Sequence, residues 1–250
     1  MKNKVALITG GASGIGKGMV RMFAKRGCQV IIFDIQDEKG ESLVKELTEE
    51  GKKVVYRHVD LFNINEIKAA FAWIKDQYGK LDYAMNNAGF GIPAKPLDEF
   101  TSEEVNKVIG ICLIAVTNCM IEEVKMMKEA NFGRIVNTTS GAGLLGGKGN
   151  SVYSAAKHGV VGITKSAALD YATYNITINA VAPGAIETEL VASLKEIAPA
   201  AYKQAEESNP ACRLGKPEDI ANAAMFLCED TSSFINGVVI PVDSGYCAGK

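Results

Sequence analysis

The stretch VALITGGASGIGKG, residues 5–18, decides the fold, because a short apolar run passes directly into a glycine-rich turn. Val5–Thr9 has the length and composition of a buried strand, and the residues from Gly14 onward have helical periodicity. Gly10, Gly14 and Gly16 let the backbone approach a ligand at the helix N-terminus, where N–H groups attract anions. The G-x-x-x-G-x-G spacing alone is a weak signal, since glycine turns are often only tight connections.

Six further apolar runs follow along the chain, separated by longer segments of helical periodicity. They lie at residues 29–33, 54–59, 81–85, 134–139, 176–182 and 238–242. Such alternation predicts an α/β fold with a doubly wound, mostly parallel seven-stranded sheet, Rossmann-like, with helices on both faces. We interpret residues 1–250 as a single domain. The segment at about 187–216 lies outside the alternation and is interpreted as a substrate lid made of short helices.

Composition is that of an ordinary globular protein and argues against several functions. Hydrophobic residues make up 47 % and charged ones 22 %, and the formal net charge is −2. Binding to nucleic acid or to a membrane surface is therefore not expected. Six cysteines are scattered without a C-x-x-C pair and only two histidines are present, so we expect no metal site and reduced thiols in the cytoplasm. The apolar stretch 108–121 is expected to be a buried helix.

Asp34 ends the second predicted strand, 18 residues after Gly16. Dinucleotide-binding folds keep a carboxylate at about this distance for the adenosine ribose. A helix N-cap or turn residue is the alternative, but the order of strand, turn, helix, strand and acid favours the ribose role. A carboxylate repels a 2′-phosphate and the next residue is Ile35 rather than arginine, so we expect NAD(H) to be preferred over NADP(H). Lys17 is the counter-argument, and we expect it to point to solvent.

Tyr153 and Lys157 stand four residues apart in SVYSAAKHG (151–159) and so share one face of a helix. An ammonium group near a phenol lowers its pKa from about 10 toward the neutral range, which would make the tyrosine a general acid/base. The pair alone is weak, since surface Tyr–Lys pairs at this spacing arise by chance. Ser140 stands 13 residues before Tyr153, and its alternative reading is a turn serine after a strand.

These motifs together resemble the short-chain dehydrogenase/reductase (SDR) family. TGGASGIG, NNAG (86–89), Ser140, Tyr-x-x-x-Lys and PGAIET (183–188) stand in the family's order and span most of the chain. The resemblance implies hydride transfer between NAD(H) and a secondary alcohol or ketone. Tyr153 would be the general acid/base, Ser140 would hold the substrate oxygen, and Lys157 would assist the tyrosine and bind the nicotinamide ribose.

The resemblance also assigns a larger set of positions to the cofactor. These are Gly10, Ser13, Gly14, Ile15, Gly16, Asp34, Asp60, Leu61, Asn86, Asn87, Ala88, Gly89, Tyr153, Lys157, Pro183, Gly184, Ile186 and Thr188. Ile186 would offer its backbone to the carboxamide, and an N-cap is the rival role for Asp60. The substrate would meet Ser140, Ala142 and Tyr153. Other candidate pocket walls are Phe90, Gly91, Ile92, Gly141, Leu144, Leu145 and Asn150, whose mostly small or apolar character suggests a neutral substrate with a hydrophobic part.

One departure from the family concerns its proton relay. The family often places an asparagine in the helix after NNAG, and an ungapped alignment puts Cys112 there. A thiol is a poor donor and acceptor, so turnover should be slower if the relay needs the side-chain amide. Two other functions stay open: a 3-oxoacyl-carrier-protein reductase, which Asp34 argues against, and an NAD-binding sensor without turnover, which only Cys112 favours. The resemblance further suggests a homotetramer, with the helices of residues 101–129 and 151–175 between subunits.

Overall fold

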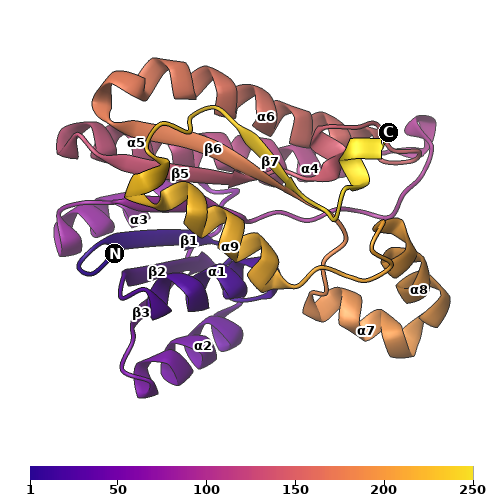
Figure 1. Cartoon of the computed structure of the whole chain (residues 1–250), viewed down its shortest axis with the longest axis horizontal. Helices are drawn as coiled ribbons and strands as arrows, with labels where there is room; N and C mark the ends of the chain where they lie inside the picture. The colour runs from indigo at the N-terminus through magenta and orange to yellow at the C-terminus, as the bar shows by residue number, and fades with distance from the viewer. Residues whose placement is uncertain (250) are drawn as a thin grey trace.

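The protein is described by a computed structural model covering residues 1–249, apart from the side chain of Leu190. Across these residues, seven strands form one sheet in the order β3-β2-β1-β4-β5-β6-β7 (Figure 1). They are β1 Val5–Thr9, β2 Gln29–Asp34, β3 Lys53–His58, β4 Tyr83–Asn86, β5 Gly133–Thr138, β6 Ile176–Pro183 and β7 Val239–Val242. Every neighbouring pair is parallel, so the predicted α/β sheet is confirmed and is more regular than expected.

Helices cover both faces of this sheet because successive strand residues point to opposite sides. Leu7 and Ile31 belong to a core shared with α3, α5 and α6, whereas Ile8 and Ile32 belong to a core shared with α1, α2 and α9. The helices are α1 Gly14–Lys25, α2 Asp37–Glu49, α3 Ile64–Tyr78, α4 Ser102–Ile109, α5 Ala115–Ala130, α6 Ser151–Tyr171, α7 Glu189–Ile197, α8 Pro199–Ser208 and α9 Pro217–Cys228. The strands are therefore apolar on both faces, which explains their continuous apolar sequences.

The long helix expected at 101–129 is interrupted by a wider turn. A π-helical turn, Gly110–Ile114, separates α4 from α5. Taken as one run, Ser102–Ala130 is long and apolar enough by composition to cross a membrane. Its inner side nevertheless packs in the core through residues such as Val108 and Met127, both 0 % exposed. We therefore describe the run as a core helix with a local change of hydrogen-bond spacing, a feature often found at functional sites.

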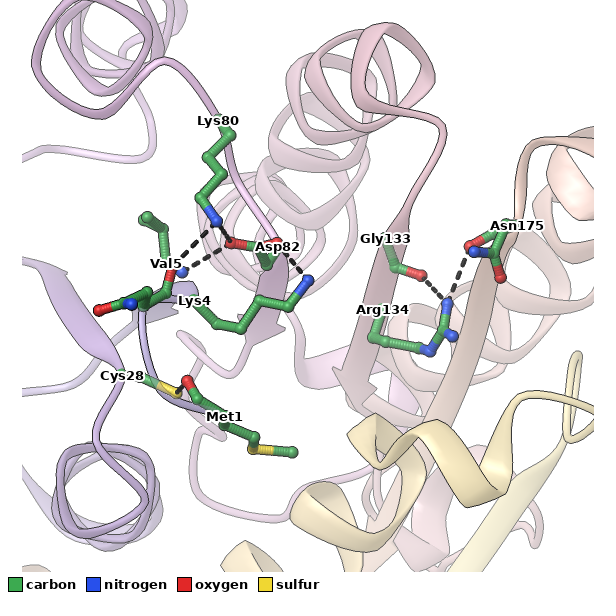
Figure 2. Close-up of polar contacts among 10 residues, drawn as sticks. Met1, Lys4, Val5, Cys28, Lys80, Asp82, Gly133, Arg134 and Asn175 are labelled. Carbon is green, nitrogen blue, oxygen red and sulfur yellow. Dashed lines mark hydrogen bonds and ion pairs between the residues drawn. The ribbon is translucent and has the colours of Figure 1, made fainter.

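Charged side chains lie at the N-terminal ends of the strands (Figure 2). Asp82, just before β4, is 5 % exposed and is paired with Lys4 at 2.8 Å and Lys80 at 3.0 Å. Arg134 on β5 is also buried and donates to the carbonyl oxygen of Asn175 at 2.8 Å. These partners compensate for the loss of hydration of the buried charges. The cavity lies at the opposite, C-terminal ends of the strands.

Residues 187–216 contain α7 and α8, as the prediction of short helices requires. Both project beside the carboxyl edge of the sheet, away from its packed helices (Figure 1). A bridge between Ile186 and Gly215 joins the two ends of the segment. The segment therefore leaves the sheet and returns to it at the same place, close to the end of β6.

Candidate active site

A cavity of about 700 Å³ runs along the carboxyl ends of the strands from β1 to β6. At one end lies the glycine turn, where Gly10 and Gly14 have φ of +64° and +52°, a region that favours glycine. Ser13 precedes α1, makes no side-chain cap within the described chain, and is followed by a first turn without acidic residues. The N–H groups at the start of α1 therefore remain available for an anion, and the turn fits a pyrophosphate.

Gly16, predicted to contact the cofactor, lies behind the turn rather than on the cavity wall. A Cβ atom at this position would overlap the carbonyl oxygen of Gly10. Gly16 is therefore needed for the close packing of α1 against the turn. Ser13 and Ile15 line the cavity as predicted, together with Gly10 and Gly14.

Asp34 lies at the end of β2, 7 % exposed, and its carboxylate organises the turn. Its Oδ2 accepts a hydrogen bond from the N–H of Ala12 at 3.0 Å, and its Oδ1 accepts one from Ile35 at 2.8 Å. The N-cap of α2 is Gln36, so the N-cap reading of Asp34 is wrong. Asp34 also lines the cavity, so its carboxylate lies on the wall at which the adenosine ribose is predicted to bind.

An apolar part of the cavity wall lies next to Asp34. Asp60 and Leu61 line it as predicted, beside Ile35 and Phe62, which are 61 % and 52 % exposed. Such exposed apolar side chains on a cavity wall suit a flat base such as adenine. Asp60 accepts from the N–H of Phe62 at 2.9 Å, while Asn63 is the N-cap of α3, so the rival N-cap role of Asp60 is wrong.

The NNAG motif follows β4 and divides into two roles. Asn87, Ala88 and Gly89 line the cavity, and the N–H groups of Asn87 and Ala88 donate to Thr9 Oγ1 at 3.0 and 3.1 Å. Asn86 is 1 % exposed and instead donates to Glu123 at 3.0 Å inside the core. The expectation that Asn86 contacts the cofactor is therefore wrong, because alternate residues of a strand point to opposite sides.

Ser140, Tyr153 and Lys157 line the same cavity together with Pro183, Gly184 and Ile186, and Thr188 lines it beside Gly14. Lys157 is 3 % exposed and donates to the carbonyl oxygen of Thr138 at 2.9 Å. Its Nζ lies 5.7 Å from the centre of the Tyr153 ring. The hydroxyl of Ser140 accepts from the N–H of Ala142 at 3.2 Å, which fixes its position after β5. The three predicted catalytic side chains are thus brought together from two elements.

The electrostatics of Tyr153 differ from the simple expectation. Burial raises its pKa to about 12, Cys112 adds to the increase, and a hydrogen bond with Ser140 opposes it. Burial also lowers the pKa of Lys157. The expected lowering of the tyrosine pKa is not achieved by Lys157 within the protein alone, because the loss of hydration dominates. Tyr153 consequently keeps its proton at neutral pH and is set up as a proton donor.

Cys112 lies in the π-helical turn, fully buried beside Lys157. Its Sγ donates to the carbonyl oxygen of Phe90 at 3.3 Å. A Cβ atom added to Gly89 would lie 3.2 Å from Cys112 Sγ and 3.6 Å from Lys157 Nζ, so the thiol and the ammonium flank the same glycine. The ungapped alignment therefore locates the residue beside the lysine, as a relay would require.

We expect Cys112→Asn to raise kcat about threefold to tenfold and to shift the pH profile, because an amide both donates and accepts hydrogen bonds beside Lys157. Steady-state rates between pH 6 and 10 measure this. Cys119→Asn is the matched control: Cys119 is also buried on the same helical run, and its replacement should lower stability without moving the pH profile. An unchanged rate and profile in Cys112→Asn would remove the side chain from the relay.

The substrate side of the cavity is smaller than predicted. Phe90 and Gly91 line it with Ser140, but the remaining candidates do not. Off the cavity lie Ile92, Gly141, Ala142, Leu144, Leu145 and Asn150. For Gly141, Ala142, Leu144 and Leu145 the cause is the 3₁₀ turn Gly141–Gly143, which bends the chain behind Ser140. The prediction also missed part of the lining, namely Phe33, Gln36, Lys39, Val59, Phe62, Ile111, Thr138, Thr139 and Ala185, whereas Glu189 and Val191 belong to the segment predicted as a lid. Ile35 also lines the cavity, and its position directly after Asp34 was the only sequence signal for a wall residue outside the predicted set.

Cofactor and proton donor must meet in one space for hydride transfer, and this cavity connects the glycine turn with Tyr153. The fold and the site therefore define a dinucleotide-dependent oxidoreductase. The chain belongs to the short-chain dehydrogenase/reductase family, since residues 10–247 match the family profile adh_short_C2, described as Enoyl-(Acyl carrier protein) reductase.

Similar proteins act on alcohols and ketones. The cyclohexanol dehydrogenase of Acinetobacter sp. (strain SE19) is 40 % identical over 244 residues, covering 98 % of this chain and 95 % of that protein. The crystal structure of levodione reductase has a TM-score of 0.93 and 35 % identity, with 100 % of both chains covered. ElxO, solved with NADP bound, has a TM-score of 0.93 and 33 % identity, covering 99 % of this chain and 100 % of its own. This protein is accordingly an oxidoreductase of the SDR family, whose members typically use a nicotinamide cofactor.

Proposed function

We propose that the protein is an NAD(H)-dependent dehydrogenase of neutral secondary alcohols, and reductase of the corresponding ketones, with cyclic compounds as its substrates. The observation that carries the proposal is the presence of Ser140, Tyr153 and Lys157 on the wall that also holds the glycine turn. Phe90 and Gly91 line the cavity with Tyr153, and neither of them is charged. The names of the cyclohexanol dehydrogenase and the levodione reductase support a cyclic substrate.

In this proposal the protein's own groups perform the proton transfer. The nicotinamide ring, when bound, supplies or accepts the hydride at the carbinol carbon, and its positive charge in the oxidised form favours the tyrosinate. During ketone reduction the hydroxyl of Tyr153 gives its proton to the substrate oxygen and becomes a tyrosinate, and during alcohol oxidation the tyrosinate takes the proton of the alcohol. Ser140 holds the oxygen against Tyr153, and Lys157 holds the nicotinamide ribose and returns the proton.

The preference for NAD(H) rests on Asp34 and its surroundings. A 2′-phosphate beside this carboxylate would bring like charges together. Lys39 also lines the cavity, but its ammonium is paired with Glu189 at 2.8 Å. Lys17, expected to point to solvent, lies 3.7 Å from the same carboxylate. Both lysines are thus partly neutralised, which leaves Asp34 as the dominant charge near the ribose.

A panel of cyclic and linear secondary alcohols with NAD⁺ or NADP⁺ tests this proposal. We expect kcat/KM with cyclohexanol to be at least about tenfold higher with NAD⁺ than with NADP⁺. Ile35→Arg should reverse much of this ratio, because Ile35 is exposed on the cavity wall and arginine pairs with phosphate. Lys25→Arg, on the far end of α1, is the control and should change nothing.

The outcomes of the panel separate the proposed function from its alternatives. Equal use of NADP⁺ by the unmodified protein would contradict the cofactor preference. Activity confined to 3-oxoacyl thioesters with NADPH would instead identify a carrier-protein reductase. Binding of NADH without oxidation by any ketone in the panel would identify a sensor.

Three further features belong to the proposal. The segment 187–216 serves as the substrate lid, since Thr188, Glu189 and Val191 extend the cavity wall beyond β6. Copies of the chain assemble as a homotetramer, which would cover apolar side chains such as Ile114 and Leu169, 54 % and 82 % exposed. The protein works in the cytoplasm as a single-domain enzyme, and its buried thiols suit a reducing compartment.

A further inference from the structure

We infer that Asn209, which directly follows α8 within the segment 187–216 and was not predicted to have a role of its own, positions the backbone that receives the nicotinamide. The inference rests on the proposed function, because it concerns the same cofactor. Asn209 is 4 % exposed although its side chain is an amide. A buried amide must find hydrogen-bond partners, and their identity shows what the side chain holds in place.

The partners of Asn209 are backbone groups of the segment that follows β6. Its Nδ2 donates to the carbonyl oxygen of Ala185 at 2.9 Å, and its Oδ1 accepts from the N–H of Ala185 at 3.2 Å. The same Nδ2 donates to the carbonyl oxygen of Arg213 at 2.8 Å. The N–H and the carbonyl oxygen of Ala185 are thus both hydrogen-bonded to one side chain, as they would be to a neighbouring strand.

The hydrogen bonds between Asn209 and Ala185, called the Asn209 clamp below, lie directly beside the part of the cavity predicted to bind the nicotinamide. Ala185 lines the cavity between Gly184 and Ile186, which line it as well. A Cβ atom on Gly184 would lie 2.7 Å from Asn209 Oδ1, so the absence of a side chain there allows the close approach. Gly215 completes the support, since its N–H donates to the carbonyl oxygen of Ala185 at 2.9 Å.

The Asn209 clamp also ties the end of the α7–α8 segment to its beginning. Residues 184–186 leave β6, and Asn209 follows after α7 and α8. Without the amide, the peptide of Ala185 would keep its bond to Gly215 but lose both bonds to Asn209. The backbone of Ile186 would then adopt a wider range of positions, and a carboxamide bound there would lose favourable geometry.

Binding of NADH and ADP-ribose, measured by calorimetry on the full chain, tests this role. ADP-ribose lacks the nicotinamide, so it reports on the glycine turn and the ribose site alone. We expect Asn209→Leu to raise the Kd of NADH about tenfold and to leave the Kd of ADP-ribose within about twofold. Asn209→Asp keeps the acceptor but loses both donors, and it should change the ratio of the two Kd values in the same direction.

Asn179→Leu is the matched control. Asn179 is 0 % exposed and also bridges two backbone groups, donating to Ile235 at 2.8 Å and accepting from Val238 at 3.0 Å, but it lies within β6. Its replacement should lower Tm and affect both ligands alike. Should Asn209→Leu not fold, Asn209→Asp decides the question.

An unchanged ratio of the two Kd values in the Asn209 variants would overturn the inference, provided the unmodified protein binds NADH more tightly than ADP-ribose and turns over alcohols. If the unmodified protein binds neither ligand, or turns over no alcohol, the proposed function itself fails. The two failures are therefore distinguishable.

Discussion

Replacing Tyr153 by phenylalanine should lower kcat by about 10²- to 10⁴-fold and leave NADH binding almost unchanged. The ring remains to fill its buried position, so only the hydroxyl group is lost. That hydroxyl holds its proton firmly, because burial raises the pKa of Tyr153 to about 12. In the proposed function it is the proton donor beside Ser140 in the cavity, and water could not replace it with the same orientation.

Steady-state kinetics and NADH fluorescence measure the two parts of this result. Tyr174→Phe is the control, since Tyr174 lies in a surface turn where its ring faces Lys128 at 4.7 Å. Its replacement should leave kcat unchanged. In the unmodified enzyme, alcohol oxidation should become faster as the pH rises, because the reaction needs the deprotonated tyrosine. A Tyr153→Phe variant that retains more than about a tenth of the original kcat would exclude Tyr153 as the general acid/base.

The second large effect concerns the stability of the fold and depends on Glu123. This residue of α5 is 0 % exposed, and burial raises its pKa to about 8 from an ordinary value of 4.5. Its Oε2 accepts from Asn86 at 3.0 Å, while Glu123 Oε1 and Asn86 Oδ1 have no partner among residues 1–249. A protonated carboxyl group supplies the missing donor, so the buried acid is neutral at neutral pH.

The raised pKa makes stability depend on pH in a defined direction. Below pH 4.5 the carboxyl group of Glu123 is protonated in both the folded and the unfolded chain, so it does not make the free energy of unfolding depend on pH. Between 4.5 and about 8 the folded chain retains a proton that the unfolded chain releases, so stability falls as the pH rises. The slope is about 1.4 kcal/mol per pH unit, and the loss is complete above the folded pKa.

Glu123→Gln should remove this slope, because an amide of the same shape carries no proton to release. The free energy of unfolding of both proteins, measured in urea at one protein concentration from pH 5 to 9, tests the effect. The variant should become the more stable protein by a margin that grows up to about pH 8. Glu122→Gln is the control, since Glu122 is paired with Lys125 at 2.8 Å on the outer side of the helix. Equal slopes in all three proteins would show that Glu123 is ionised inside the core.

Much of the fold could be predicted because its strands are buried on both faces. β1 was predicted with its observed bounds, and β6 was predicted to end at 182 rather than Pro183. The π-helical turn at Gly110–Ile114 was missed, since its side chains are as apolar as those of the helices around it. A local change in hydrogen-bond spacing leaves no periodic signal in a short apolar stretch.

The site could be predicted where its residues lie close together in the sequence, and less well where they come from distant parts of the chain. The glycine turn and the pair Tyr153 and Lys157 are local motifs, and they line one cavity. Ala142 was placed on the substrate because it follows Ser140, but the turn after β5 carries it off the wall. Asn209 gave no signal at all, because its partner Ala185 is 24 residues away in the chain.

The charged N-terminal ends of the strands have a practical meaning for engineering. Asp82, Lys4 and Arg134 link neighbouring strands at the end of the sheet remote from the cavity, and the side chains of Asp82 and Arg134 are buried there (Figure 2). Protein engineers could therefore search for thermostable variants at these ends and for altered substrate range at the opposite ends. Substitutions at the two ends of the strands should combine additively, since distant sites usually act independently.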